Sequence, residues 1–538
     1  MIPALSVTAV KDWLQDGGEL ALLDVRERGQ IGEGHLLWSV ATPFSRFEAE
    51  LCRLVPNPAT RLLLIDEGDG LAERAADRAQ ALGYGTVAIL AGGVPAWTAA
   101  GGRVFQGVNV ASKAFGELVE HTLATPSIGP EELAARREAG EALVILDGRP
   151  FEEYSKMTIP GSRCCPNGEL PFRITALVPD ASTTVVINCA GRTRSILGTE
   201  ILRSIGLPNP VLALRNGTMG WELAGYAVER GADRRYGDGT DGEALQTLVA
   251  RTRELARRAG VARLSATQAV AWLANPGRTT YVFDVRTAEE YRQSHLPGVP
   301  HAPGGQLIQA TDQWVGVRGA RLLLLDDQGE RAPVVAAWLA VAGWETAILD
   351  QAQAAWPDLA DHLSVPPKLS LPALPVLTAA ALGGLPGTPC LLLDLRGSLA
   401  FRAGHIAGAH WAIRSRLPGL LSEYPLGKPI VLVATDPVVA QLAAQDIAAL
   451  GHPLPFLLED GPDGWAAAGL PVDRTPDLPA DQHAIDHLFF THDRHAGNLD
   501  AARRYLDWET GLVDQLEDLD RQRLLTGLAR LALPRSGR

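Results

Sequence analysis

The sequence predicts an α/β fold in which one domain occurs four times and a helical tail follows. Four apolar runs end in Asp-x-Arg, and a tryptophan follows each of these aspartates after 71–74 residues. The aspartates lie 123, 137 and 110 residues apart, which is the size of a domain rather than of a solenoid repeat. The aspartate–tryptophan pairs are Asp24 and Trp97, Asp147 and Trp221, Asp284 and Trp356, and Asp394 and Trp465.

Strands and helices alternate within each repeat. In the second repeat, residues 143–147, 183–188 and 211–214 read as short buried strands, and residues 195–206 read as a helix with apolar positions four apart. This alternation predicts a mostly parallel sheet with helices on both faces. The same elements recur as strands 61–65, 87–90, 321–325, 347–349, 429–433 and 456–458, and as helices 71–83, 332–343 and 438–451.

The repeats and the segments between them set the domain boundaries. Helical patterns at 108–123 and 244–260 and a proline-rich stretch at 364–375 read as connectors. From about Pro476 the pattern predicts two charged amphipathic helices, the clearer one over 501–533. We expect this tail to pack on a domain or on a second copy, which makes it a candidate homodimer surface. The predicted parts are domains 1–106, 125–232, 262–360 and 372–474, and tail 475–538.

Composition excludes several classes of protein. A net charge of −13, from 62 acidic and 49 basic residues, argues against general binding to nucleic acid. No apolar stretch approaches the length of a membrane span, and no signal-peptide pattern opens the chain. Five scattered cysteines predict neither a disulfide framework nor a zinc site. We therefore expect a cytoplasmic protein with reduced thiols and no metal or cofactor. Four tail histidines read as solvated or packing residues: His483, His487, His492 and His495.

Cys189 directly follows the predicted strand 183–188 and begins a loop that leads into a helix. Ligands of parallel sheets bind at the carboxyl ends of strands, and the N-terminus of a helix favours an anion. Arg192 and Arg194 add positive charge. We expect these conditions to lower the pKa of the Cys189 thiol from ~8.5 toward ~3.5–7.5 and to make its thiolate a nucleophile.

Together these motifs resemble the rhodanese (sulfurtransferase) family. The resemblance rests on the Asp-x-Arg strand, a His-Ile-x-Gly-like turn such as 405–408, the strand–Cys–loop–helix and the turn before each tryptophan. It implies that Cys189 takes the outer sulfur of a small anionic donor such as thiosulfate. The resulting persulfide then passes the sulfur to cyanide or a thiol. The residues expected to hold the persulfide and donor are Ala190, Gly191, Arg192, Thr193, Arg194 and Ser195, with Arg149 as a weaker candidate.

Two further cysteines lie nearby in sequence. Cys164 and Cys165 follow a turn that passes close to the active loop in rhodanese domains, so they are candidates for a persulfide relay. The alternative is that they are small buried residues. Asp147 belongs to a pair that recurs in all four repeats, which favours a structural role.

The other three repeats do not have the cysteine. Asp66, Asp326 and Asp436 lie 42 residues after their repeated aspartates, as Cys189 does, although Ala434 lies nearer the end of its strand. An aspartate cannot carry a transferable sulfur, so these repeats are predicted to be inactive. Their aspartates read as helix caps.

Three alternative functions stay open. The donor could be mercaptopyruvate or a persulfide. The chain could be a rhodanese-fold phosphatase, although Cys189 to Arg194 is Cys-x4-Arg rather than the Cys-x5-Arg of that class. It could also be a largely non-enzymatic docking scaffold. In tandem rhodaneses the pocket lies between adjacent domains, so the first or third domain is expected to wall it.

Overall fold

A computed structural model describes residues 2–237, 242–350, 354, 356–363, 366–383, 390–492 and 497–531. Its internal contacts divide the chain into two units. One unit comprises Met1–Gly107 and Pro366–Phe489, and the other comprises Val108–Val365 and Phe490–Arg538. The first domain therefore shares a unit with the fourth, and the second shares a unit with the third and most of the tail.

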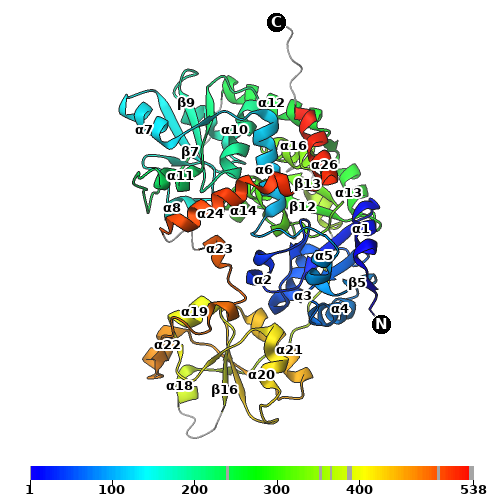
Figure 1. Ribbon diagram of the computed structural model, residues 1–538. Coiled ribbons are helices and arrows are strands. Elements are labelled where there is room, and N and C mark those ends of the chain that lie inside the picture. Colours follow the sequence, from blue (N-terminus) through cyan, green and yellow to red (C-terminus); the bar gives the residue numbers. More distant parts are fainter. Residues whose placement is uncertain are drawn as a thin grey trace. The chain divides into compact units, whose positions relative to one another are not determined.

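The second domain has a parallel five-stranded sheet in the order β6-β10-β9-β7-β8. Figure 1 shows β7 and β9 side by side at its centre. The strands and the helices that cover them match the predicted alternation. These elements are α6 (Val110–Leu123), β6 (Ser127–Ile128), α7 (Pro130–Glu138), β7 (Leu143–Asp147), α8 (Phe151–Lys156), β8 (Arg163–Cys164), α9 (Leu170–Leu177), β9 (Thr184–Asn188), α10 (Thr193–Ser204), β10 (Val211–Leu214) and α11 (Gly217–Leu223).

The third domain repeats this order with four parallel strands, β11-β14-β13-β12. An isolated parallel bridge between Asp284 and His301 lies where the other domains have an edge strand. Its elements are α12 (Glu243–Ala259), β11 (Ala262–Leu264), α13 (Ala266–Leu273), β12 (Thr280–Asp284), α14 (Ala288–Gln293), α15 (Gly304–Gln309), β13 (Arg321–Leu325), α16 (Ala332–Val341), β14 (Glu345–Leu349) and α17 (Trp356–Ala360).

The first and fourth domains have the same sheet order, β1-β5-β4-β2-β3 and β15-β20-β19-β16-β18. The first contains β1 (Ala4–Leu5), α1 (Val7–Gln15), β2 (Leu20–Asp24), α2 (Arg28–Glu33), β3 (Val40–Ala41), α3 (Phe47–Leu54), β4 (Arg61–Ile65), α4 (Leu71–Ala81), β5 (Val87–Leu90) and α5 (Gly93–Ala99). The fourth contains β15 (Val376–Leu377), α18 (Ala379–Gly383), β16 (Leu391–Asp394), α19 (Ser398–Ala403), β17 (His405–Ile406), β18 (His410–Trp411), α20 (Leu417–Leu421), β19 (Ile430–Val433), α21 (Pro437–Ala449), β20 (Phe456–Leu458), α22 (Pro462–Ala467) and β21 (Val472–Asp473).

The repeated tryptophans have a structural role. Each of the four is buried in the core of its own domain. In the third and fourth domains the arginine of Asp-x-Arg lies over the tryptophan ring, with Arg286 5.1 Å from the centroid of Trp356 and Arg396 4.9 Å from that of Trp465. In these two domains the arginine of Asp-x-Arg and the repeated tryptophan therefore pack against each other.

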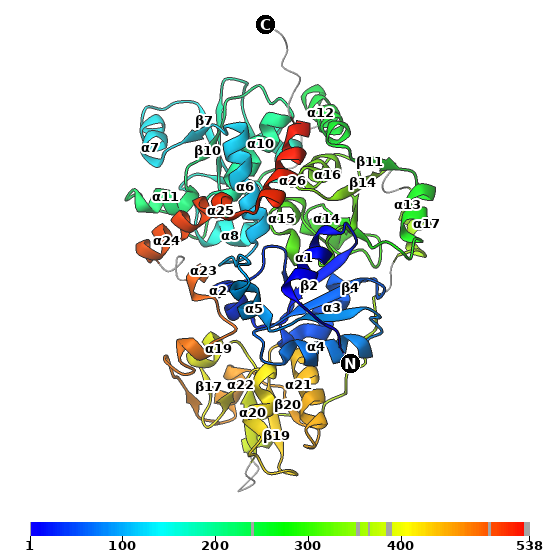
Figure 2. The same ribbon diagram turned by 45° about the vertical axis from the view of Figure 1, so that its right-hand side comes forward.

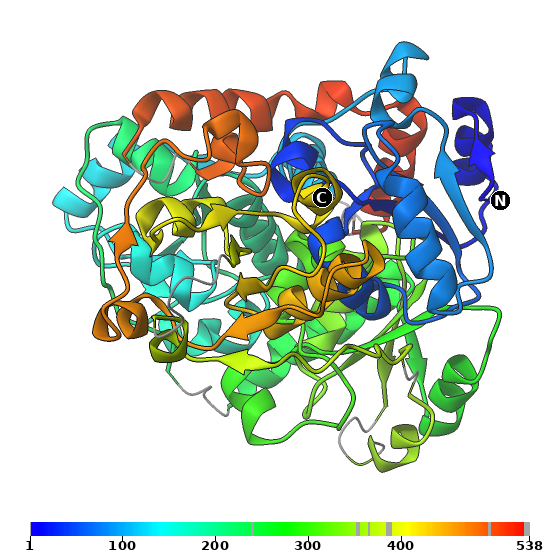
Figure 3. The same cartoon turned by 90° about the horizontal axis from the view of Figure 1, so that it is seen from below.

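The tail differs from the single long helix expected over 501–533. It forms α23 (Phe489–His492), α24 (Leu499–Thr510), α25 (Leu512–Gln515) and α26 (Asp518–Leu528). Gly511 ends α24, and Leu516 is extended with ψ 139°, which separates α25 from α26. These breaks let α24 and α25 contact the second domain while α26 packs against both α6 and α16 (Figure 2). Figure 3 shows the tail helices, in red, from below.

The described tail therefore covers its own chain. The backbone of Val341 in α16 lies so close to Gly527 that a Cβ there would come 1.9 Å from the Val341 carbonyl oxygen. A homodimer through the tail stays a prediction. No described helix is long and apolar enough to cross a membrane. His495 lies outside the described residues, and a cytoplasmic location stays a prediction.

Candidate active site

Cys189 lies at the carboxyl end of β9, at the start of a loop that the rest of the domain holds in place. Its carbonyl oxygen accepts hydrogen bonds from the backbone N–H of Thr218 at 2.8 Å and from the Thr218 hydroxyl at 3.0 Å. Gly217 has φ +55°, and a Cβ there would come 2.4 Å from this carbonyl oxygen. The turn before Trp221 thus needs a glycine because its backbone supports the cysteine loop directly.

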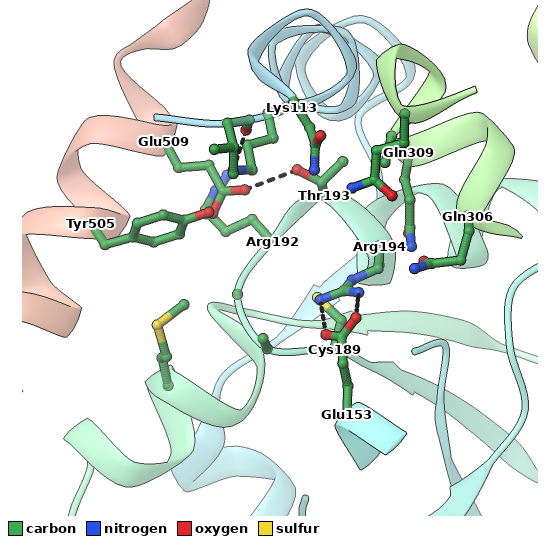
Figure 4. Close-up of a pocket in the computed structure, with 17 residues that line it drawn as sticks. Lys113, Glu153, Cys189, Arg192, Thr193, Arg194, Gln306, Gln309, Tyr505 and Glu509 are labelled. Carbon is green, nitrogen blue, oxygen red and sulfur yellow. Dashed lines mark hydrogen bonds and ion pairs between the residues drawn. The ribbon is translucent and has the colours of Figure 1, made fainter. Parts of the chain in front are cut away.

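The Cys189 thiol is buried at the base of a cavity of about 190 Å³. The loop residues 189–194 form one wall of the cavity, and Lys113 and Met219 from the same domain contribute to it. The third domain contributes Gln306, Gln309, Ala310 and Gln313, and the tail helix α24 contributes Tyr505 and Glu509 (Figure 4). Of the two domains expected to wall the pocket, the third lines it within this unit.

The expectation of a lowered thiol pKa is not met. Burial raises the pKa of Cys189 above its ordinary value, and the Glu509 carboxylate raises it further. The Arg194 guanidinium and a hydrogen bond to the Ser195 hydroxyl, at 3.7 Å, act in the opposite direction but are outweighed. Sequence pattern reveals the positive groups, but it does not reveal that the sulfur is removed from water.

The two loop arginines are already paired with carboxylates. Arg192 donates to Glu117 at 2.8 and 2.7 Å and also contacts Glu120, both in α6. Arg194 donates to both oxygens of Glu153 at 2.8 Å. Glu117 is fully buried whereas the Glu153 side chain is 39% exposed, so an incoming anion can compete for Arg194 more readily than for Arg192.

Arg149 does not meet the expectation that it helps to bind the donor. Its guanidinium donates to Asp147 at 2.8 and 2.7 Å and to the Met157 carbonyl oxygen at 2.6 Å, and it is not among the described residues that line the cavity. Asp147 also accepts from Thr158 and Asn188. The structure therefore supports the structural interpretation of Asp147 and places Arg149 with it.

Cys164 and Cys165 are both buried away from the described lining of the Cys189 cavity. Cys164 instead lines a second cavity of about 140 Å³ between the second and third domains. Burial raises the pKa of Cys164 to about 12 and that of Cys165 well above its ordinary value. This geometry favours the interpretation of both as small buried residues over a relay.

Strand pairing identifies which residues correspond to Cys189 in the other domains. Asp147 pairs with Asn188, and Cys189 follows it; in the same way Asp66 follows the partner of Asp24, and Asp326 follows the partner of Asp284. In the fourth domain Asp394 pairs with Val433, so the corresponding residue is Ala434. Asp436, the other candidate there, caps α21 by accepting from the Val438 N–H.

The aspartates at the position of Cys189 accept hydrogen bonds from the backbone N–H groups of their own loops. Asp66 accepts from the backbone N–H groups of Gly68 and Ala72 at 2.9 and 3.0 Å. Asp326 accepts from Gly329 and, at 2.8 Å each, from Arg331 and Ala332. In the Cys189 loop no described residue accepts a hydrogen bond from the N–H groups of residues 190–194. That loop alone of these three leaves its donors open to a ligand.

A cluster of two glutamates and one histidine near the loop has the composition of a cation site. Oxygen atoms of Glu117 and Glu120 and a ring nitrogen of His121 lie within 4.8 Å of one another. Arg192 already donates to both carboxylates, so their charge is balanced by the protein itself.

Comparison with known proteins agrees with the repeat and the fold. The family model of the rhodanese-like domain matches residues 6–100, 129–224, 265–358 and 378–468. This chain belongs to the rhodanese family. Its four rhodanese domains and helical tail also match the crystal structure of a thiosulfate sulfurtransferase from Pseudomonas aeruginosa, with 41% identity and a TM-score of 0.87. The match covers 97% of this chain and 99% of that one.

A second relative is similar to this chain over about the length of one rhodanese domain. An HTH-type transcriptional regulator from Mycobacterium tuberculosis is 36% identical over 107 residues, which is 20% of this chain and 46% of the regulator. The chain thus spans less than half of that protein.

Proposed function

We propose that this chain is a thiosulfate sulfurtransferase that carries sulfur as a persulfide on Cys189. The observation that supports this most directly is the Cys189 loop, whose backbone N–H groups are open to a ligand. At the position of Cys189 the other three domains of this chain have aspartate or alanine. The similarity over nearly the whole chain to the Pseudomonas aeruginosa thiosulfate sulfurtransferase supports the same donor.

The first half of the reaction forms the persulfide. The Cys189 thiolate attacks the outer sulfur of thiosulfate, the S–S bond of the donor breaks, and its electron pair leaves with sulfite. The N–H groups of residues 190–194 then stabilise the negative charge on the outer sulfur. Arg194 stabilises the thiolate before attack and, when Glu153 turns away, binds the donor anion.

The second half returns the thiolate. A nucleophilic acceptor attacks the outer sulfur, the Sγ–Sδ bond breaks and Cys189 keeps the electron pair. With cyanide the product is thiocyanate, and with a thiol it is the hydropersulfide of that thiol. Because sulfite leaves before the acceptor enters, both substrates use the same cavity.

The test is thiocyanate formation from thiosulfate and cyanide by the wild type and by Cys189→Ala. We expect the variant to lose at least about 10³-fold in kcat, because it has no nucleophile. Cys390→Ala, which removes a half-buried thiol of the other unit, is the matched control and should keep full activity. Undiminished activity of Cys189→Ala would overturn the assignment, and activity on p-nitrophenyl phosphate instead would favour the phosphatase alternative.

A further inference from the structure

Three buried oxygen atoms without a hydrogen-bond partner among the described residues belong to side chains that line the Cys189 cavity. They are Oε2 of Glu509 and Oε1 of Gln306 and of Gln309. Glu509 is 2% exposed, and its other oxygen accepts from the Thr193 hydroxyl at 2.9 Å (Figure 4). A buried carboxylate oxygen without a donor is costly, so this position indicates a ligand that brings one.

No described cation donates a hydrogen bond to this Glu509 oxygen, although Arg192 lies near enough to interact with its charge. Of the cations that line the cavity, Arg192 is paired with Glu117 and Glu120, and Arg194 is paired with Glu153. Lys113 donates to the Val108 carbonyl oxygen at 2.7 Å and lies 4.9 Å from the ring centroid of Trp508. An ammonium has three N–H donors, so Lys113 keeps donors for a further acceptor.

The loop of the third domain that corresponds to the Cys189 loop faces a carboxylate of the second domain, Glu169. Glu169 lies 22 residues after Asp147, as Gln306 lies 22 residues after Asp284. Glu169 accepts from Arg331 of the third domain's loop at 2.7 Å and from Arg173 at 3.2 Å. Ion pairs within the protein therefore satisfy the carboxylate on that side, whereas the Cys189 side keeps neutral amides and one unsatisfied carboxylate oxygen.

We propose that the sulfur acceptor is an α-amino acid thiol, of which cysteine is the simplest, whose ammonium binds Glu509 and whose carboxylate binds Lys113. This inference rests on the proposed function. Thiosulfate itself has no N–H group and is repelled by Glu509, so the unsatisfied carboxylate matches the second substrate rather than the first. Glu509 is then a binding residue that the tail adds to the rhodanese site.

The transfer step balances without any further reagent. The thiol of the bound amino acid gives its proton to the Cys189 persulfide anion, the resulting thiolate attacks the outer sulfur, and a new S–S bond forms. The Sγ–Sδ bond breaks, its electron pair stays on Cys189, and the proton leaves with the product, the hydropersulfide of the amino acid. Cys189 is again a thiolate, ready for thiosulfate.

Sulfite release at fixed thiosulfate measures every acceptor with one readout. The acceptors are cyanide, 2-mercaptoethanol, cysteamine, 3-mercaptopropionate and cysteine, with rates corrected for the thiolate fraction of each thiol. We expect kcat/KM for cysteine to exceed that for 2-mercaptoethanol by about 100-fold, with about tenfold from each charged group. Cysteamine and 3-mercaptopropionate should fall between them.

Two variants separate the two charged groups. Glu509→Gln keeps an oxygen for Thr193 and should lower the cysteamine to 2-mercaptoethanol ratio about tenfold. Lys113→Gln should lower the cysteine to cysteamine ratio about tenfold. Asp507→Asn makes the same charge change as Glu509→Gln at an exposed position of α24 and should leave both ratios unchanged.

The outcomes distinguish the inference from the proposed function. Equal kcat/KM for the four thiols, or a Glu509→Gln variant with wild-type ratios, would overturn the inference while sulfite release with cyanide still supports the proposed function. No sulfite with any acceptor, cyanide included, and no persulfide on Cys189 by mass spectrometry would overturn both.

Discussion

Arg192 and Glu117 form an ion pair with two hydrogen bonds, Nε to Oε1 at 2.8 Å and Nη2 to Oε2 at 2.7 Å. The pair joins the cysteine loop to helix α6, and Glu117 is fully buried. Arg194, two residues further along, pairs with the much more exposed Glu153. Two arginines that look equivalent in the sequence therefore have different partners, and we expect them to have different roles.

The first prediction separates these roles. Arg192→Gln leaves Glu117 buried without its cation, so the free energy of unfolding should fall by about 3 kcal/mol at alkaline pH, where this carboxyl is ionised. Urea denaturation measures this. Burial raises the pKa of Glu117 to about 7. Arg192 lowers that pKa, so the pKa of Glu117 lies higher still in the variant, and its carboxyl takes up a proton before that of the wild type as the pH falls. The difference from wild type should therefore shrink from alkaline to neutral pH. A loss that stays constant with pH would contradict this explanation.

Arg194→Gln should act on the donor instead. Removing the cation that an anion can reach should raise KM for thiosulfate about tenfold, with a smaller effect on unfolding than Arg192→Gln has. Steady-state kinetics with varied thiosulfate measures it. Equal KM increases for the two variants would show that both arginines bind the donor.

The pH dependence of persulfide formation follows from the raised pKa of Cys189. Only the thiolate attacks, so the rate of the first sulfite burst should rise about tenfold per pH unit until the pH reaches the thiol pKa. Arg194 opposes the rise in pKa, so Arg194→Gln should shift the profile to higher pH. Rapid-quench measurement over neutral to alkaline pH tests both. A rate independent of pH would mean that the thiol is already ionised.

A cysteine placed in the third domain should not become active. In a Cys189→Ala background, Asp326→Cys should give no thiocyanate above background. Arg331, in the loop that Asp326 begins, is held by Glu169 at 2.7 Å and Glu290 at 2.8 Å, which closes this loop to a donor. Peptide mass spectrometry after incubation with thiosulfate provides an independent check, and a persulfide on the introduced cysteine would refute the closure.

Persulfide should be found on Cys189 and not on its neighbours in sequence. Cys164 lines a separate cavity, and Cys165 is fully buried. Mass spectrometry of the thiosulfate-treated protein, with and without acceptor, should show modification at Cys189 alone. Transfer of the label to Cys164 or Cys165 would restore the relay hypothesis.

A buried ion pair should hold the first and fourth domains together. Arg414 donates to Glu48 at 2.5 and 2.8 Å and to Asp446 at 3.0 Å, and all three side chains are buried. Arg78 keeps its own ion pair with Asp446 at 2.6 Å and lies 3.8 Å from Glu48, so Arg414→Met removes one of the cations of this cluster rather than all of them. It should lower the free energy of unfolding of this unit by about 3 kcal/mol. Arg257→Met, which removes an arginine from a solvent-exposed pair, is the control and should change nothing measurable.

The local sequence pattern predicted most of the helices and strands, because the order of apolar and polar residues along a short segment is what defines a buried strand or an amphipathic helix. The strand at 211–214 and those at 61–65 and 321–325 have the predicted bounds, and the helix expected over 195–206 runs from Thr193 to Ser204. The long tail helix was wrong, since periodicity alone does not show that Gly511 and Leu516 break it. The position corresponding to Cys189 in the fourth domain needed the strand register as well.

By itself, the sequence determined the four repeats, the family they resemble and the single cysteine at a strand end, because each is a matter of spacing along the chain. Only the tertiary structure decided that the second domain pairs with the third, where a Cβ at Gly168 would come 2.7 Å from the backbone nitrogen of Gly305. It also decided that Glu509, 320 residues after Cys189, lines the cavity and that the thiol is buried. Close packing between distant segments sets these features, and no local pattern of residues encodes it.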